Sequence, residues 1–179
     1  MDSALRTQLE KSLGRGAVSG DVIAPRDTDG VVAAVRLLAI TRTRFAISSD
    51  AGPAATGVTL TTMNLDDVTV APASLTLRAG AGAAPAAVVG AAAEHGLAVV
   101  GMAPQVRAGH VGALLARGEV PRRSLCGIEA VVPGGELVRF GGGVLKDVVG
   151  YDLPALLLGS MGRLAVIVAA TFRLEPAAA

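Results

Sequence analysis

The sequence is poor in the residues that build disulfides and metal centres. Cys126 is its only cysteine, and it contains only two histidines. A single cysteine excludes a disulfide within the chain, and so few thiol and imidazole ligands exclude an ordinary zinc site. We therefore expect no metal site.

Long apolar runs are also missing. The longest, residues 164–172, includes Thr171 and is far shorter than the roughly 18–20 residues that a bilayer-spanning helix needs. Charged residues at Asp2, Arg6 and Glu10 interrupt the N-terminus, which therefore lacks the apolar core of a secretion signal. We expect no membrane span and a cytoplasmic location.

Neither sign of charge is in excess. The 16 Lys and Arg residues balance 15 Asp and Glu residues, which leaves a formal net charge of +1. A balanced chain has no overall field to attract a polyanion, so we expect no nucleic-acid partner. The sequence also contains no Gly-x-x-x-x-Gly-Lys-Ser/Thr phosphate loop and no recognisable Ser–His–Asp grouping.

Helix and strand patterns alternate in the first third of the chain. Leucines at four-residue spacing predict a helix over residues 2–13. Short strands over 22–25 and 44–48 flank a second helix, and its apolar stripe consists of Val31, Val32, Val35, Leu38 and Ala39. A strand, a capped helix and a strand in this order predict a βαβ unit with parallel strands.

From residue 58 the pattern changes to short strands separated by turns. Segments 58–62, 68–70 and 75–80 alternate in polarity, which predicts antiparallel pairing. The remaining predicted elements are a helix over 84–95, a hairpin over 127–142 that turns at Gly134-Gly135, a helix over 152–160 and a closing strand over 164–176.

These patterns predict an α+β fold with two lobes. We expect an N-terminal helix and loop over residues 1–19, followed by one domain over residues 20–176. A small βαβ lobe covers about residues 20–57, and a larger lobe with a mostly antiparallel sheet and flanking helices covers about residues 58–176.

Four sequence blocks then occur in a characteristic order. They are "VIAPRDTDGVVAAVRLLA", "TTMNLDDVTVAPASLTLRAGAG", "VVPGGELVRFGG" and "KDVVGYDLPALLLGSMGRLAVIVAATFRLEP". In this order they resemble the PCMH-type FAD-binding domain of the vanillyl-alcohol-oxidase/glycolate-oxidase superfamily, and most of all the small FAD-binding subunit of bacterial glycolate oxidase. The resemblance implies an FAD between the two lobes, with its pyrophosphate in two glycine-rich loops and its ring near the hairpin and the last strand.

The first of these loops corresponds to residues 49–57. The family pattern is Arg-Gly-x-Gly-Thr-x-x-x-Gly, whereas this chain offers Ser49, Asp50, Ala51, Gly52, Pro53, Thr56 and Gly57 as cofactor-binding candidates. Pro53 has no N–H to donate, and Asp50 places a carboxylate where the resemblance puts a dianion. One such like-charge pair at about 4 Å costs roughly 4 kcal/mol at an effective dielectric near 20. Ser49 and Thr56 keep hydroxyl donors.

The second loop follows Pro104. The resemblance assigns cofactor contacts there to Pro104, Gly109, His110, Val111 and Gly112, with Ile167 contributing from the last strand. His110 and Arg107 can replace lost donors because both side chains bind phosphate oxygens. The alternative for His110 is an ordinary solvent-facing loop residue. No His or Cys stands in the first loop, so we expect non-covalent FAD.

Two functions are compatible with these residues. The first is an FAD-binding subunit or domain of a glycolate-oxidase-like oxidoreductase that oxidises 2-hydroxy acids. In that case the flavin carries the chemistry, and another chain supplies the substrate domain or the electron acceptor. No catalytic residue can be assigned. The alternative is a degenerate, non-catalytic member that binds FAD weakly or has lost it and acts as a structural or regulatory partner. The altered first loop and the missing substrate domain favour this alternative.

Overall fold

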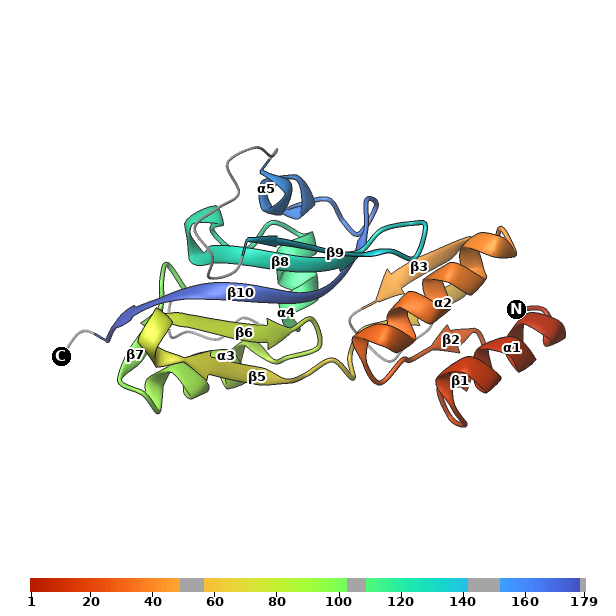
Figure 1. Ribbon diagram of the computed structural model, residues 1–179, viewed down its shortest axis with the longest axis horizontal. Coiled ribbons are helices and arrows are strands. Elements are labelled where there is room, and N and C mark those ends of the chain that lie inside the picture. Colours follow the sequence, from red (N-terminus) through yellow and green to blue (C-terminus); the bar gives the residue numbers. More distant parts are fainter. Residues whose placement is uncertain (49–56, 103–108, 142–151, 178–179) are drawn as a thin grey trace.

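The computed structural model describes residues 1–48, 57–102, 109–141 and 152–177. These residues form two sheets that lie side by side, each with helices packed on it (Figure 1). The small lobe contains α1 (Ser3–Leu13), β1 (Val18–Ser19), β2 (Val22–Ile23), α2 (Thr28–Ile40), β3 (Phe45–Ser48) and β4 (Val58–Thr61).

The large lobe follows along the chain. It contains β5 (Val68–Ala71), the 3-10 turn η1 (Pro72–Ser74), β6 (Thr76–Gly80), α3 (Pro85–Ala93), β7 (Leu97–Val99), α4 (Val111–Ala116), the 3-10 turn η2 (Arg122–Ser124), β8 (Leu125–Val131), β9 (Leu137–Gly141), α5 (Leu153–Leu157) and β10 (Val166–Pro176).

The sheet of the small lobe confirms the predicted parallel βαβ unit. Its strand order is β1-β2-β4-β3, and β4 runs parallel to both β2 and β3. The helix between them, α2, begins where the Asp27 carboxylate accepts a hydrogen bond from the Gly30 amide at 2.7 Å. From its apolar stripe Val31, Val35 and Leu38 are buried in a core that also contains Leu5 and Leu9 of α1, whereas Ala39 is exposed. The N-terminal helix, predicted as a separate segment, is therefore part of the small lobe.

Strand β4 corrects the expectation of antiparallel pairing from residue 58 onward. All four of its residues are buried, as in a parallel strand that is covered on both faces. Because β4 lies between β2 and β3, the change of sheet falls between β4 and β5. The predicted lobe boundary near residue 57 does not coincide with it.

The sheet of the large lobe is antiparallel, as predicted. Its strand order is β5-β6-β10-β8-β9, and β7 pairs with the C-terminal end of β10. Helices α3 and α4 cover one face of this sheet (Figure 1). The core between them contains fully buried Leu77, Leu115 and Phe172.

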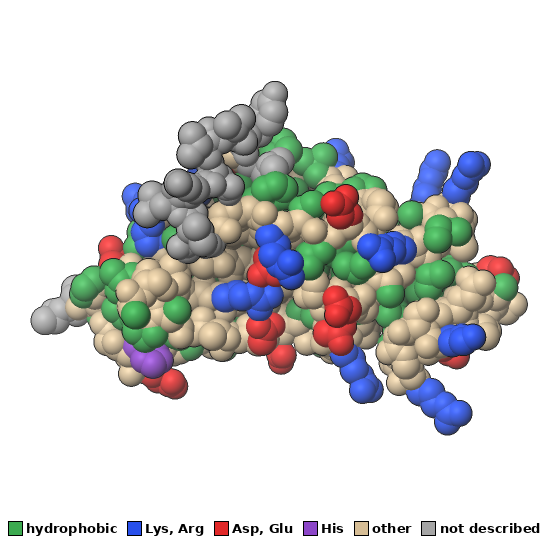
Figure 2. Space-filling view, viewed as in Figure 1, with side chains coloured by type: hydrophobic (Ala, Val, Ile, Leu, Met, Phe, Trp, Pro, Cys, Tyr) green, Lys and Arg blue, Asp and Glu red, His purple; other side chains and the backbone are tan. Residues whose placement is uncertain are grey.

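The opposite face of this sheet is polar. Arg78 donates from Nε to Glu129 at 2.6 Å and from Nη1 to Asp67 at 2.6 Å, and Arg139 donates to Glu129 at 3.3 Å. Charged side chains gather over the middle of the molecule in Figure 2. The sheet therefore separates an apolar core on its helical side from an ion-pair network on the other side.

Strand β10 contributes side chains to the cores of both lobes. Val166 and Val168 of β10 pack into the core of the small lobe, whereas Ile167 packs into the core of the large lobe. This division follows from the two-residue period of a strand. The guanidinium of Arg36 on α2 also donates to the Gly135 carbonyl at the predicted hairpin turn, at 3.0 Å.

Within the described ranges, no helix has both the length and the apolar character needed to cross a bilayer.

Candidate functional site

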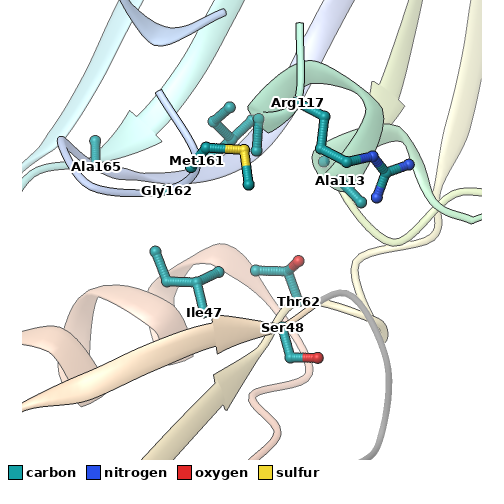
Figure 3. A pocket seen from close by; sticks show the side chains of 11 residues that line it. Ile47, Ser48, Thr62, Ala113, Arg117, Met161, Gly162 and Ala165 are labelled. Carbon is teal, nitrogen blue, oxygen red and sulfur yellow. The ribbon is translucent and has the colours of Figure 1, made fainter. Parts of the chain in front are cut away.

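A cavity of about 240 Å³ opens between the two lobes (Figure 3). The small lobe contributes the end of β3 and the residue after β4, and the large lobe contributes α4 and the segment that leads into β10. The described lining residues are Ile47, Ser48, Thr62, Gly112, Ala113, Ala116, Arg117, Met161, Gly162, Ala165 and Ile167.

Helix α4 has two distinct faces. Val111, Leu114 and Leu115 are buried in the core of the large lobe. The other face, which consists of Gly112, Ala113, Ala116 and Arg117, lines the cavity. Residues three and four positions apart lie on the same side of a helix, as do 112/116, 113/116 and 113/117, and three of the four residues are small. The local sequence therefore leaves room beside one long cationic side chain.

The segment 159–162 closes the C-terminal end of α4. The Gly159 amide donates to the Leu115 carbonyl at 3.0 Å, and the Met161 amide donates to the Ala116 carbonyl at 2.8 Å. Met161 and Gly162 have φ values of +54° and +70°. The segment thus satisfies carbonyls that a helix end leaves without internal partners, and it places Met161 in the lining of the cavity.

Arg117 is the one charged side chain among the described lining residues. Figure 3 shows it extending from α4 on the side of the cavity opposite Ser48 and Thr62. Its side chain is 41% exposed, and its Nε forms an ion pair with Glu119. The cavity therefore combines one cation and two hydroxyl groups with apolar walls.

The structure brings two of the predicted site residues to this cavity, Gly112 and Ile167. Gly57, Gly109, His110 and Val111 do not line it. Seven further candidates lie outside the described residues: Ser49, Asp50, Ala51, Gly52, Pro53, Thr56 and Pro104.

His110 differs from the interpretation as a solvent-facing loop residue. It occupies the N-cap position of α4 without a side-chain capping bond, and it is half-buried rather than solvent-facing. Gly109, directly before it, has a φ of +111°, and a Cβ there would lie 3.6 Å from Nη2 of Arg117.

The amides of Val111 and Gly112 both have partners within the fold. The Val111 amide donates to the Ala83 carbonyl at 2.9 Å, and the Gly112 amide donates to the Ala81 carbonyl at 2.8 Å. A Cβ on Gly112 would lie 2.9 Å from the Ala81 Cβ. Glycine is needed here because α4 packs closely on the end of β6.

Sequence reasoning missed Ser48, Thr62 and Arg117 as site residues. A signal for Arg117 was present, because it continues the small-residue face of α4 one position beyond Ala116. Ser48 and Thr62 gave no local signal. Their place in the site depends on the parallel pairing of β3 with β4, in which Ser48 lies opposite Thr61.

Comparisons with known proteins extend the sequence resemblance. No protein-family model matches the chain. D-lactate dehydrogenase of Archaeoglobus fulgidus is 34% identical over 140 residues, which cover 73% of this chain and 31% of that protein. Glycolate oxidase subunit GlcD of Bacillus subtilis is 42% identical over 57 residues, which cover 32% of this chain and 12% of GlcD. The chain thus spans less than a third of the length of these curated relatives.

Solved structures agree on the fold. The 4-ethylphenol oxidase of Gulosibacter chungangensis superposes with a TM-score of 0.77 at 17% identity, covering 97% of this chain and 42% of that one. An alkyldihydroxyacetonephosphate synthase superposes with a TM-score of 0.67 at 15% identity, covering 87% of this chain and 31% of that one. The chain is therefore homologous to FAD-linked oxidoreductases and has the two-lobe, PCMH-type FAD-binding fold.

Proposed function

We propose that this protein is the FAD-binding domain or subunit of a flavin-dependent oxidoreductase that acts on a 2-hydroxy acid. The observation that supports this most strongly is the inter-lobe cavity. It lies where the resemblance implied a cofactor and is lined by two of the residues it implied, Gly112 and Ile167. The names of the D-lactate dehydrogenase and glycolate oxidase relatives supply the substrate class.

The lining of the cavity fits part of an FAD molecule. Ser48, Thr62 and Arg117 provide hydroxyl and guanidinium donors for phosphate or ribose oxygens. Ile47 and Ile167 provide apolar surface for a ring. A volume of about 240 Å³ is smaller than the roughly 300–1,000 Å³ of most ligand pockets. The described residues would therefore hold only a portion of the dinucleotide.

Bound FAD would supply the hydride or electron transfer. The residues of this chain would bind the cofactor and limit its contact with water. We assign the substrate-binding residues and the electron acceptor to a partner chain or to further residues of the protein, because the curated relatives are more than three times the length of the matched region. No group in the cavity is assigned as a catalytic base.

One observation favours the second candidate, a non-catalytic member that has lost FAD. The amides of Val111 and Gly112 are engaged with the carbonyls of Ala83 and Ala81, so they add no donors to the cavity. Such a protein would act as a structural or regulatory partner through its surface.

An absorption spectrum of the purified protein, followed by titration with FAD, separates these two functions. The first predicts a yellow protein, or uptake of about one added FAD per chain. A matched pair of variants then locates the site. Ala113→Phe fills the cavity and should abolish uptake, whereas Ala87→Phe on the exposed side of α3 should not. A colourless protein that takes up no FAD, alone or with its partner, supports the second function.

A further inference from the structure

We propose that Arg117 binds the diphosphate of FAD and takes the place of the Val111 and Gly112 amides, which donate to main-chain carbonyls. This inference rests on the proposed FAD-binding function. Arg117 is neither a glycine-loop residue nor part of the implied cofactor motif, and it enters the site only through its position at the end of α4.

The first argument is the charge of the cavity. A diphosphate carries negative charge that needs cationic or N–H partners when it leaves water. Among the described lining residues only Arg117 is charged, and none is acidic. A guanidinium also presents paired N–H groups that match two phosphate oxygens at once.

The second argument is that two other possible donors, the amides of Val111 and Gly112, already have partners. The amides of Val111 and Gly112 already donate to main-chain carbonyls at 2.9 and 2.8 Å. Ser48 and Thr62, which carry hydroxyl groups, line the cavity on the side opposite Arg117 (Figure 3). A phosphate between them would therefore receive its charge-assisted contacts from Arg117.

The third argument is that Arg117 can change partner. Its ion pair with Glu119 involves two partly exposed side chains, 41% and 32% accessible, so water screens it and its net stabilisation is small. A diphosphate carries more charge than a carboxylate and can displace it at the guanidinium. Gly109 adds no side chain beside Nη2, which keeps that side of the guanidinium accessible.

The test is a fluorescence titration of FAD at about 50 and 300 mM NaCl, a range over which exposed charges become screened. We expect Arg117→Ala to weaken binding about 10- to 100-fold, as expected for loss of a charge-assisted hydrogen bond. The variant should also show a smaller salt dependence than the wild type. Arg117→Lys keeps the charge without the paired donors and should fall between the two.

Arg173→Ala is the matched control, because Arg173 is an exposed arginine on β10 that does not line the cavity. It should bind FAD like the wild type. Thermal unfolding of the proteins without FAD checks the fold, and Arg117→Ala should match the wild type there.

The outcomes separate this inference from the function on which it rests. If the wild type binds FAD and Arg117→Ala binds it equally well with the same salt dependence, Arg117 is not the diphosphate ligand, although the protein remains FAD-binding. If the wild type takes up no FAD, both proposals are overturned.

Discussion

Arg122 and Asp152, thirty residues apart, form a two-pronged ion pair. Arg122 Nε lies 3.0 and 2.9 Å from the two carboxylate oxygens, and Nη2 lies 2.8 Å from Oδ1. The same carboxylate accepts from the Ala155 amide at 3.2 Å and so caps α5. Hydrogen bonding from Arg122 lowers the pKa of Asp152. One side chain thus ties α5 to the turn before β8.

Substitutions at Asp152 should distinguish how much its helix cap and its ion pair each contribute to the stability of the fold. Asp152→Ala removes both and should lower the free energy of unfolding by about 1–2 kcal/mol. Asp152→Asn keeps a capping oxygen and loses only the exposed ion pair, so it should cost less than about 1 kcal/mol. Urea unfolding at neutral pH measures both values. Equal losses in the two variants would show that the ion pair, and not the cap, stabilises α5.

The stability of the large sheet should depend on pH through Glu129. Partial burial would raise the pKa of Glu129, but hydrogen bonds and charge from Arg78 and Arg139 outweigh it and place the pKa below its ordinary value. Glu129 therefore stabilises the fold above its unfolded pKa, and this contribution disappears as the pH falls through the folded pKa. Urea unfolding from about pH 6 down to pH 3 should show a steeper loss in the wild type than in Glu129→Gln. Parallel profiles for the two proteins would contradict this prediction.

Two glycine-to-alanine substitutions should have opposite effects. Gly112→Ala places a Cβ 2.9 Å from the Ala81 Cβ and 3.1 Å from its carbonyl oxygen, so it should destabilise the protein by about 1–3 kcal/mol. Gly90→Ala on α3 meets no atom within 4 Å and should stabilise the helix by about 0.5–1 kcal/mol. Thermal unfolding of both variants gives the comparison. A neutral Gly112→Ala would mean that α4 can move away from Ala81.

Truncation of Phe172 should lower the free energy of unfolding more than truncation of any other apolar residue of β10. It is fully buried and lies opposite Leu77 of β6 and Leu125 of β8 in the register of the sheet. Truncation to alanine leaves a cavity and should cost about 3–5 kcal/mol of unfolding free energy. Phe140→Ala on β9 is the control, because that ring is only partly buried and should cost less. Similar losses at both positions, measured by urea unfolding, would argue against a rigid core at Phe172.

The sequence by itself determined several helices and strands and the protein family that the chain resembles. Apolar periodicity predicted α1 and α2, and paired glycines predicted the β8–β9 hairpin. These features depend on residues close together in the chain, where spacing and backbone preference decide the conformation. The order of the blocks predicted the PCMH-type fold because it preserves the order of elements in that family.

Only the tertiary structure decided where β4 belongs and which groups reach the cavity. The short segment 58–61 has no turn or period that reveals a parallel partner, and its pairing depends on β2 and β3. The amides of Val111 and Gly112 gain their carbonyl partners only when α4 packs on the end of β6. Arg117 likewise lines the same cavity as Ser48 and Thr62 only because Val166 and Val168 of β10 pack into the core of the small lobe. Contacts between distant residues arise from the packing of whole elements, which residue spacing along the chain does not specify.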